Sequence, residues 1–111
     1  MQPKKSMKII FRNICGLNGI HKQEIVRNMI RDHRLDLFLI QETKMKKEKF
    51  EKISFGKGMR NTTTNLDWAS GGLLTIWKEA FKANIIFDEG NIFLMNFYDL
   101  KTLDRWFLLN I

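Results

Sequence analysis

The most constraining feature of this chain is a pair of short apolar segments separated by a stretch of helix length. Met7–Arg12 and Leu35–Gln41 are rich in β-forming residues, and the second has almost no polar alternation. Between them, His21–Arg34 carries a single helical stripe formed by Ile25, Val26, Met29, Ile30 and His33. Near-continuous apolar strands joined through a helix indicate a β-α-β unit, whose two strands run parallel and are covered on both faces.

Beyond this unit the pattern changes to short strands with few helices between them. Lys44–Ile53 is expected to form a short lysine-rich helix, and Gly56–Asn65, which holds two glycines and three consecutive threonines, a loop. Four more strands are predicted, at Gly71–Trp77, Ala83–Phe87, Asn91–Tyr98 and Arg105–Ile111. A hairpin-like connection joins the last two, so they are expected to pair antiparallel. The pattern predicts an α/β fold, with a mixed sheet and helices packed on one side.

The composition is that of a folded protein. The 111 residues are enough for one domain with a core, and 44% hydrophobic and 12% aromatic residues argue against a disordered tail. No apolar run approaches the roughly 18–20 residues that cross a bilayer. The basic start of the chain also lacks the apolar stretch of a secretory signal. We therefore expect an intracellular protein, for which the nucleus is a compatible compartment. Cys15 is the only cysteine, which excludes an intrachain disulfide and makes a zinc site unexpected.

The positive charge is concentrated in the first part of the chain. The formal net charge is +7, but residues 1–60 hold 15 Lys and Arg against 6 Asp and Glu, whereas residues 61–111 hold 4 against 6. A basic half suggests a polyanionic partner, because Lys and Arg contacts to phosphate supply most non-specific affinity for nucleic acid. A solvated lysine-rich helix would explain the same charge, so composition alone leaves both interpretations open.

A polar residue comes at the end of each of the two predicted parallel strands. Asn13 follows the first strand, and Glu42 follows the second. The carboxyl ends of parallel strands meet at one edge of a sheet, where open α/β sheets place their ligands. A carboxylate beside a hydrogen-bonding amide is the start of a magnesium phosphodiesterase site. Spacing alone leaves structural alternatives, because Glu42 would also serve as a helix-start carboxylate and Asn13 as a turn residue.

Three ordered motifs give the chain a family resemblance. The first motif, Met-Lys-Ile-Ile-Phe-Arg-Asn-Ile-Cys-Gly-Leu-Asn over residues 7–18, is similar to a Met-Lys-Ile-Ile strand leading into Trp-Asn-x-Arg-Gly-Leu-Asn. The second motif is Gln41-Glu42-Thr43-Lys44, at the end of an apolar strand. The third is Ser70-Gly71-Gly72, which precedes a strand and Trp77-Lys78. Together they resemble the endonuclease/exonuclease/phosphatase superfamily, and within it the endonuclease domain of plant LINE-type (non-LTR) retrotransposons.

The resemblance implies a fold, a cofactor and roles for particular residues. It implies the N-terminal half of a four-layer α/β sandwich of the DNase I-like type over residues 7–111, after a short extension over residues 1–6. Glu42 would be the ligand of Mg²⁺, and Asn13 would support the phosphate or the metal. DNA would be the substrate. By their position beside the site, Lys44, Lys46 and Lys47 are interpreted first as a solvated face, with phosphate contacts as a second role. Other members of the superfamily act on inositol phosphates and sphingomyelin, so the fold alone does not fix the substrate.

The chain also departs from the family pattern. Arg12 stands where the family has tryptophan, and Cys15 where it has arginine. The family's Asp-x-Asn and Ser-Asp-His motifs, which supply the general base and orient the nucleophile, do not occur in the 111 residues, and residue 111 falls inside a predicted strand. We therefore expect a truncated fragment of a magnesium-dependent DNA endonuclease of retroelement origin, inactive alone. Two alternatives are a non-catalytic basic module that binds nucleic acid through residues 1–60, and a gene remnant without a role.

Overall fold

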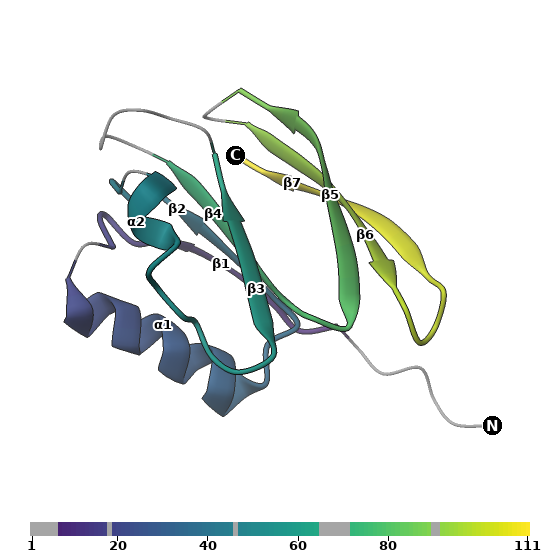
Figure 1. Ribbon diagram of the computed structural model, residues 1–111, viewed down its shortest axis with the longest axis horizontal. Helices are drawn as coiled ribbons and strands as arrows, with labels where there is room; N and C mark the ends of the chain where they lie inside the picture. Colours follow the sequence, from purple (N-terminus) through teal and green to yellow (C-terminus); the bar gives the residue numbers. More distant parts are fainter. Residues whose placement is uncertain (1–6, 18, 46, 65–71, 90–91) are drawn as a thin grey trace.

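The computed structural model describes residues 7–17, 19–45, 47–64, 72–89 and 92–111. The described chain forms two β-sheets that pack face to face, with the helices on the outer face of the first sheet (Figure 1). In chain order the elements are β1 (Ile9–Asn13), α1 (Ile20–His33), β2 (Leu37–Gln41), α2 (Lys47–Phe50), β3 (Met59–Thr63), β4 (Leu73–Lys78), β5 (Phe81–Asp88), β6 (Phe93–Asp99) and β7 (Arg105–Asn110). The predicted α/β fold class is confirmed.

The first sheet contains the β-α-β unit that the sequence predicts. Its strand order is β1-β2-β4-β3. β1 and β2 run parallel, with Ile9 opposite Leu37 and Asn13 opposite Gln41. β4 then pairs antiparallel with both β2 and β3, so the sheet is mixed.

The side chains of β2 fill two separate cores. Phe38 and Ile40, both fully buried, face the helices and pack in one core with Val26 of α1. Leu37 and Leu39, also fully buried, belong to the core between the two sheets. This arrangement explains why the segment shows no polar alternation: a strand covered on both faces has no position that tolerates a polar side chain.

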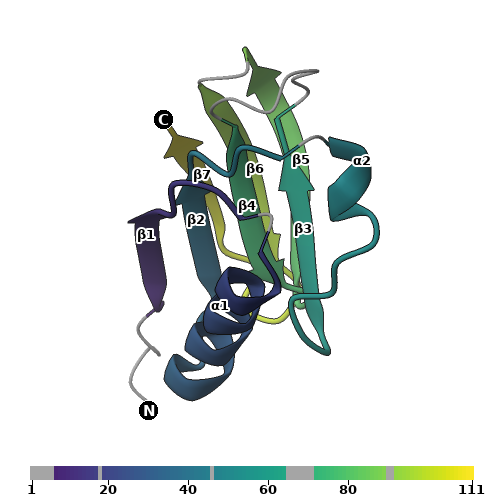
Figure 2. The same cartoon turned by 90° about the vertical axis from the view of Figure 1, so that its left-hand side faces the viewer.

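The helices cover one face of the first sheet (Figure 2). α1 buries Val26 and Ile30, and it ends at His33, because the following Arg34 adopts a left-handed conformation with φ 50°. The predicted stripe is wider than the buried one, since Ile25 is 42% exposed and His33 is exposed as well. His33 lies in the last turn, where the chain already turns away toward β2. In the described part of the chain, no helix has the length and apolarity to cross a membrane.

Two boundary predictions were wrong. The expected loop over Gly56–Asn65 contains β3, whose backbone pairs with β4 so that Thr62 lies opposite Thr75. Threonine is β-branched and favours strands. The backbone of β4 supplies the pairing partner of β3, and the local sequence does not reveal that pairing. The expected helix over Lys44–Ile53 is reduced to the four residues of α2, because Lys44 has a left-handed φ of 52° that a helix cannot include.

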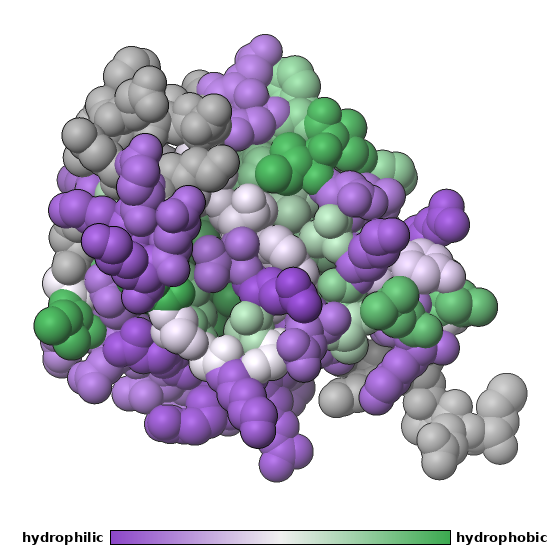
Figure 3. Space-filling model, in the orientation of Figure 1, coloured by the Kyte–Doolittle hydropathy of each residue, from purple (hydrophilic) through white to green (hydrophobic). Residues whose placement is uncertain are grey.

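The last three strands form a second sheet instead of extending the first. β5, β6 and β7 pair antiparallel in that order. One face of this sheet buries Phe93, Met95 and Phe97 against the first sheet. Several large apolar residues of β5 and β7 stay exposed: Ile85, Ile86, Phe87, Phe107 and Leu109. Figure 3 shows hydrophobic surface gathered over the β5–β6 end of this sheet.

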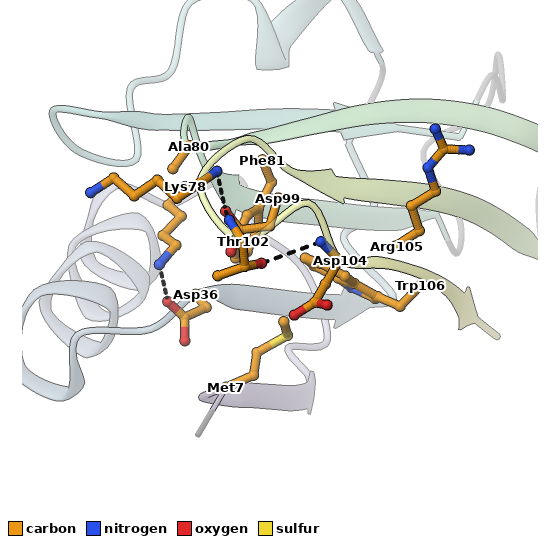
Figure 4. A pocket seen from close by; sticks show the side chains of 11 residues that line it. Met7, Asp36, Lys78, Ala80, Phe81, Asp99, Thr102, Asp104, Arg105 and Trp106 are labelled. Atoms are coloured by element: carbon orange, nitrogen blue, oxygen red, sulfur yellow. Dashed lines mark hydrogen bonds and ion pairs between the residues drawn. The ribbon is translucent and has the colours of Figure 1, made fainter. Parts of the chain in front are cut away.

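The predicted hairpin between β6 and β7 is confirmed, and Asp99 closes it (Figure 4). Its Oδ1 accepts hydrogen bonds from the backbone N–H groups of Lys101, at 2.9 Å, and Thr102, at 3.4 Å. Burial raises the pKa of Asp99, but the hydrogen bonds from Lys101 and Thr102 prevail, so that its pKa lies below the ordinary value of 3.8. The folded hairpin therefore favours the ionised carboxylate.

The stabilisation from Asp99 should disappear in acid. Because its pKa is lower in the folded than in the unfolded chain, its contribution is present above pH 3.8 and is lost as the pH falls through the lower folded value. Asp99→Ala is expected to reduce the free energy of unfolding by about 1 kcal/mol near neutral pH, and by less in acid. Urea unfolding of both proteins at several pH values measures this difference. A difference that stays constant across pH would contradict the role of the charge.

Candidate functional site

One edge of the first sheet collects the ends of three strands. The carboxyl ends of β1 and β2 and the amino end of β4 meet there, since Asn13 lies opposite Gln41 and Gln41 opposite Leu73. Glu42 follows directly after β2. The end of the second sheet reaches the same edge, where Gln41 donates a side-chain hydrogen bond to the carbonyl oxygen of Ile111. The parallel pairing thus brings the two candidate residues to the same edge, as the sequence predicts.

The structure brings Asn13 and Glu42 together through Cys15. The Asn13 Oδ1 accepts a hydrogen bond from the Cys15 backbone N–H, at 3.1 Å, and lies 3.3 Å from the Cys15 Sγ. The same Sγ lies 3.5 Å from the Glu42 Oε2. All three side chains are exposed. An amide oxygen and a carboxylate oxygen therefore converge at one solvent-accessible point, with a thiol between them.

The backbone around Glu42 is held by a continuous ladder of hydrogen bonds. Beyond β1, the N–H of Gly16 donates to the carbonyl of Glu42, at 2.7 Å, and the N–H of Leu17 to that of Thr43, at 2.8 Å. Cys15 and Glu42 both have a left-handed φ of 54°. Such a conformation costs a non-glycine residue about 1–2 kcal/mol and persists only where the surroundings enforce it. The ladder of hydrogen bonds is what enforces this conformation beside Glu42.

Gly72 allows two segments of this edge to approach closely. Its φ is +98°, and a Cβ at this position would lie 2.6 Å from the Thr43 Oγ1. The carbonyl of Gly72 accepts a hydrogen bond from the Thr43 N–H, at 3.3 Å. Gly72 is therefore needed for the close approach of its backbone to Thr43. Ser70 and Gly71 of the same motif lie outside the described residues.

Lysines surround the site unevenly. Lys44 comes two residues after Glu42 and is exposed, and its contact with a phosphate stays a prediction. Lys46 and the side chain of Lys47 lie outside the described part, so their phosphate contacts stay predictions. Sequence reasoning missed Lys22, whose Nζ donates to the carbonyls of Ile14, at 3.0 Å, and Cys15, at 3.2 Å. Only the fold places this residue of the polar face of α1 over the loop after β1.

The donor set at this edge fits a hard divalent cation in part. Magnesium binds oxygen ligands, with one or two protein carboxylates and water completing the shell. Glu42 and Asn13 offer a carboxylate and an amide oxygen, whereas the Cys15 sulfur is a soft ligand that Mg²⁺ does not prefer. Among the described residues, no group of three or more His, Cys, Asp or Glu side chains is placed to hold a metal ion. The described residues of this edge offer a metal ion two oxygen atoms, which do not complete its coordination.

One of three comparisons with known proteins identifies the fold. No protein-family model matches the chain, and no curated protein matches its sequence. Among solved structures, the chain is similar to the AP endonuclease LMAP from Leishmania major, with a TM-score of 0.71 and 18% sequence identity. The match covers 94% of this chain and 39% of that chain. The protein therefore has a DNase I-like fold. It spans about two fifths of the length of the solved structure.

Proposed function

We propose that this chain is part of a metal-dependent endonuclease domain that hydrolyses DNA phosphodiester bonds. The observation that carries the proposal is the convergence of Asn13 and Glu42 on Cys15, at the strand-end edge of a fold that an AP endonuclease shares. The motif resemblance favours the retroelement branch, and a plant LINE element is the proposed origin. Residues 7–111 are the proposed part of the domain.

Each candidate residue has a proposed role. Glu42 holds Mg²⁺ through its carboxylate, and Asn13 supports the phosphate or the metal through its amide oxygen. The bound ion would supply a Lewis acid for the phosphodiester. Lys22 and the backbone ladder position the loop that comes directly after Asn13. Lys44, Lys46 and Lys47 contact phosphates of the DNA strand beside the site.

The 111-residue chain is proposed to lack endonuclease activity by itself. The general base and the nucleophile-orienting residues of the family belong to motifs that the sequence does not contain. Catalytic groups that act as a unit lose nearly all of the rate when one is missing. Incubation of the purified chain with supercoiled plasmid and Mg²⁺ tests this point. Nicking that disappears in Glu42→Ala would show that the chain is active.

Metal binding at Glu42 can be tested without activity. Mn²⁺ takes the place of Mg²⁺ and broadens the NMR signals of nearby amides, so a titration should first broaden Cys15, Gly16 and Thr43. Glu42→Gln keeps the shape of the side chain and removes its charge. It is expected to weaken this binding by about tenfold or more, because the loss of a ligand costs at least as much as the loss of a residue that hydrogen-bonds to a ligand.

Glu79→Gln is the matched control for the metal titration. Glu79 is exposed and lies just beyond β4, at the opposite end of the sheet. The control should leave broadening near Cys15 unchanged. Equal loss in both variants, or broadening spread over the whole surface, would contradict a metal site at Glu42.

The charge distribution favours a second candidate function, in which the basic half binds nucleic acid without catalysis. Residues 1–60 hold 15 Lys and Arg against 6 Asp and Glu. Such binding should fall steeply with salt and should be unaffected by Glu42→Ala. Fluorescence anisotropy with a labelled DNA duplex measures both effects. Absence of binding at low salt would exclude this candidate.

A further inference from the structure

A cationic cavity lies at the end of the first sheet opposite the Asn13–Glu42 edge. It has a volume of about 580 Å³ and is bounded by α1, the loop before β3 and the end of β4. Ile30 and Phe55 contribute apolar wall. Its charged lining consists of Arg27, Arg31, Arg34, Lys57, Lys78 and Asp36.

The single carboxylate of this lining is already satisfied. Asp36 forms an ion pair with Lys78, at 2.8 Å (Figure 4), and accepts a hydrogen bond from the backbone N–H of Lys8, at 2.8 Å. It is also buried, so its charge is held within the protein. Asp36 and Lys78 therefore neutralise each other, and the cavity keeps the charge of the remaining cations.

Three of those cations have no acidic partner within the described ranges. Arg31 pairs with Asp32 at 3.0 Å, in an exposed ion pair. Arg27, Arg34 and Lys57 form no ion pair with a carboxylate in the described chain. Like charges gathered around one cavity repel one another, and an anion placed among them relieves that repulsion.

The dipole of α1 accounts for only part of this arrangement. Basic residues at the carboxyl end of a helix stabilise its negative end, which is sufficient reason for Arg31 in the last turn and Arg34 at the C-cap. Arg27 lies nearly two turns before the end of α1, and Lys57 belongs to another segment. Arg27 is further positioned by a hydrogen bond from its Nη1 to the carbonyl of Ser54, at 3.2 Å. This bond uses one of the five N–H donors of a guanidinium group.

We propose that this cavity binds a phosphate group, at a site separate from the candidate metal edge. Arginine suits phosphate because its planar fork donates two parallel charge-assisted hydrogen bonds. The volume is in the range of pockets that hold small ligands, and the apolar wall of Ile30 and Phe55 suits the base or sugar of a nucleotide. The phosphate comes either from a free nucleotide or from a nucleic-acid backbone that passes this end of the sheet.

NMR titration of the ¹⁵N-labelled full chain tests the site and distinguishes the two sources. The probes are inorganic phosphate, a nucleoside monophosphate and a short single-stranded oligonucleotide. Binding in the cavity should shift the amides of Arg34, Leu35, Gly56 and Lys57, and leave Cys15 unshifted with the two small probes. Shifts with the small probes indicate a free ligand, and shifts of the same cavity amides with the oligonucleotide alone indicate a backbone phosphate. Absence of cavity shifts with all three probes at low salt would overturn the proposal.

Charge variants give the second readout. Arg27→Gln with Arg34→Gln should weaken phosphate binding by about tenfold or more, because charge-assisted hydrogen bonds are lost. The matched control, Lys52→Gln with Lys82→Gln, removes the same charge from exposed positions that do not line the cavity, and its effect should be about twofold or less. Lys57→Gln, in a surface loop, repeats the test without altering α1. Equal weakening by the control would show that only overall charge matters and would overturn the proposal.

Discussion

Replacing Phe38 by alanine is expected to lower the free energy of unfolding by about 3–5 kcal/mol. Phe38 is fully buried in β2 and packs in the core between the first sheet and the helices, near Val26 and Ile30. A core this small cannot close around the lost ring without moving α1, so much of the cavity persists. Native domains have a total stability of about 5–15 kcal/mol, which makes this loss a large share. Urea unfolding followed by circular dichroism measures it.

Phe11→Ala is the matched control for the loss of an aromatic ring. Phe11 lies on β1, the neighbouring parallel strand, but it is 51% exposed. Its replacement is expected to change stability by about 0.5 kcal/mol, the range of surface substitutions. Equal losses from the two variants would contradict the assignment of Phe38 to the core. A wild-type chain with no cooperative unfolding transition would favour the gene-remnant interpretation.

The β-α-β unit could be predicted because its signals are local. Leu35–Gln41 is a short apolar run next to a helical stripe, and only a strand covered on both faces satisfies it. β3 could not be predicted, because its polar residues form a strand only through pairing with β4. The division into two sheets is also non-local. It depends on β5 pairing with β6 and not with β4, a choice that no single segment encodes.

Of the candidate site, the sequence predicted only that two polar residues lie at neighbouring strand ends. Asn13 and Glu42 lie at the ends of strands that were recognisable as parallel neighbours, so their common edge was expected from topology. The positions of Cys15 and Lys22 depend on left-handed backbone and on where α1 crosses the loop after β1. In the sequence, Cys15 is a departure from the family pattern. In the structure, the Cys15 thiol lies between the two candidate oxygen ligands, Asn13 and Glu42.

Gly72→Ala is expected to lower the free energy of unfolding by about 2–4 kcal/mol and to weaken metal binding at Glu42. Two effects add: the φ of +98° is strained for any residue with a Cβ, and that Cβ would lie 2.6 Å from the Thr43 Oγ1. Thr43 is fully buried, so it cannot swing aside, and it comes directly after Glu42. Urea unfolding measures the first effect, and the Mn²⁺ titration measures the second.

Two further variants separate the two effects. Gly58→Ala meets only a strained φ of +78°, because its Cβ would lie 3.8 Å from Glu79, and it should cost about 1–2 kcal/mol without affecting the metal. Thr43→Ala removes an oxygen that has no hydrogen-bond partner within the described residues, and in combination with Gly72→Ala it should restore the steric part of the loss. Failure of this rescue would mean that backbone strain alone makes Gly72 necessary. Rescue of both stability and metal binding would instead mean that the glycine motif acts on the site through packing, by setting the position of the strand end that carries Glu42.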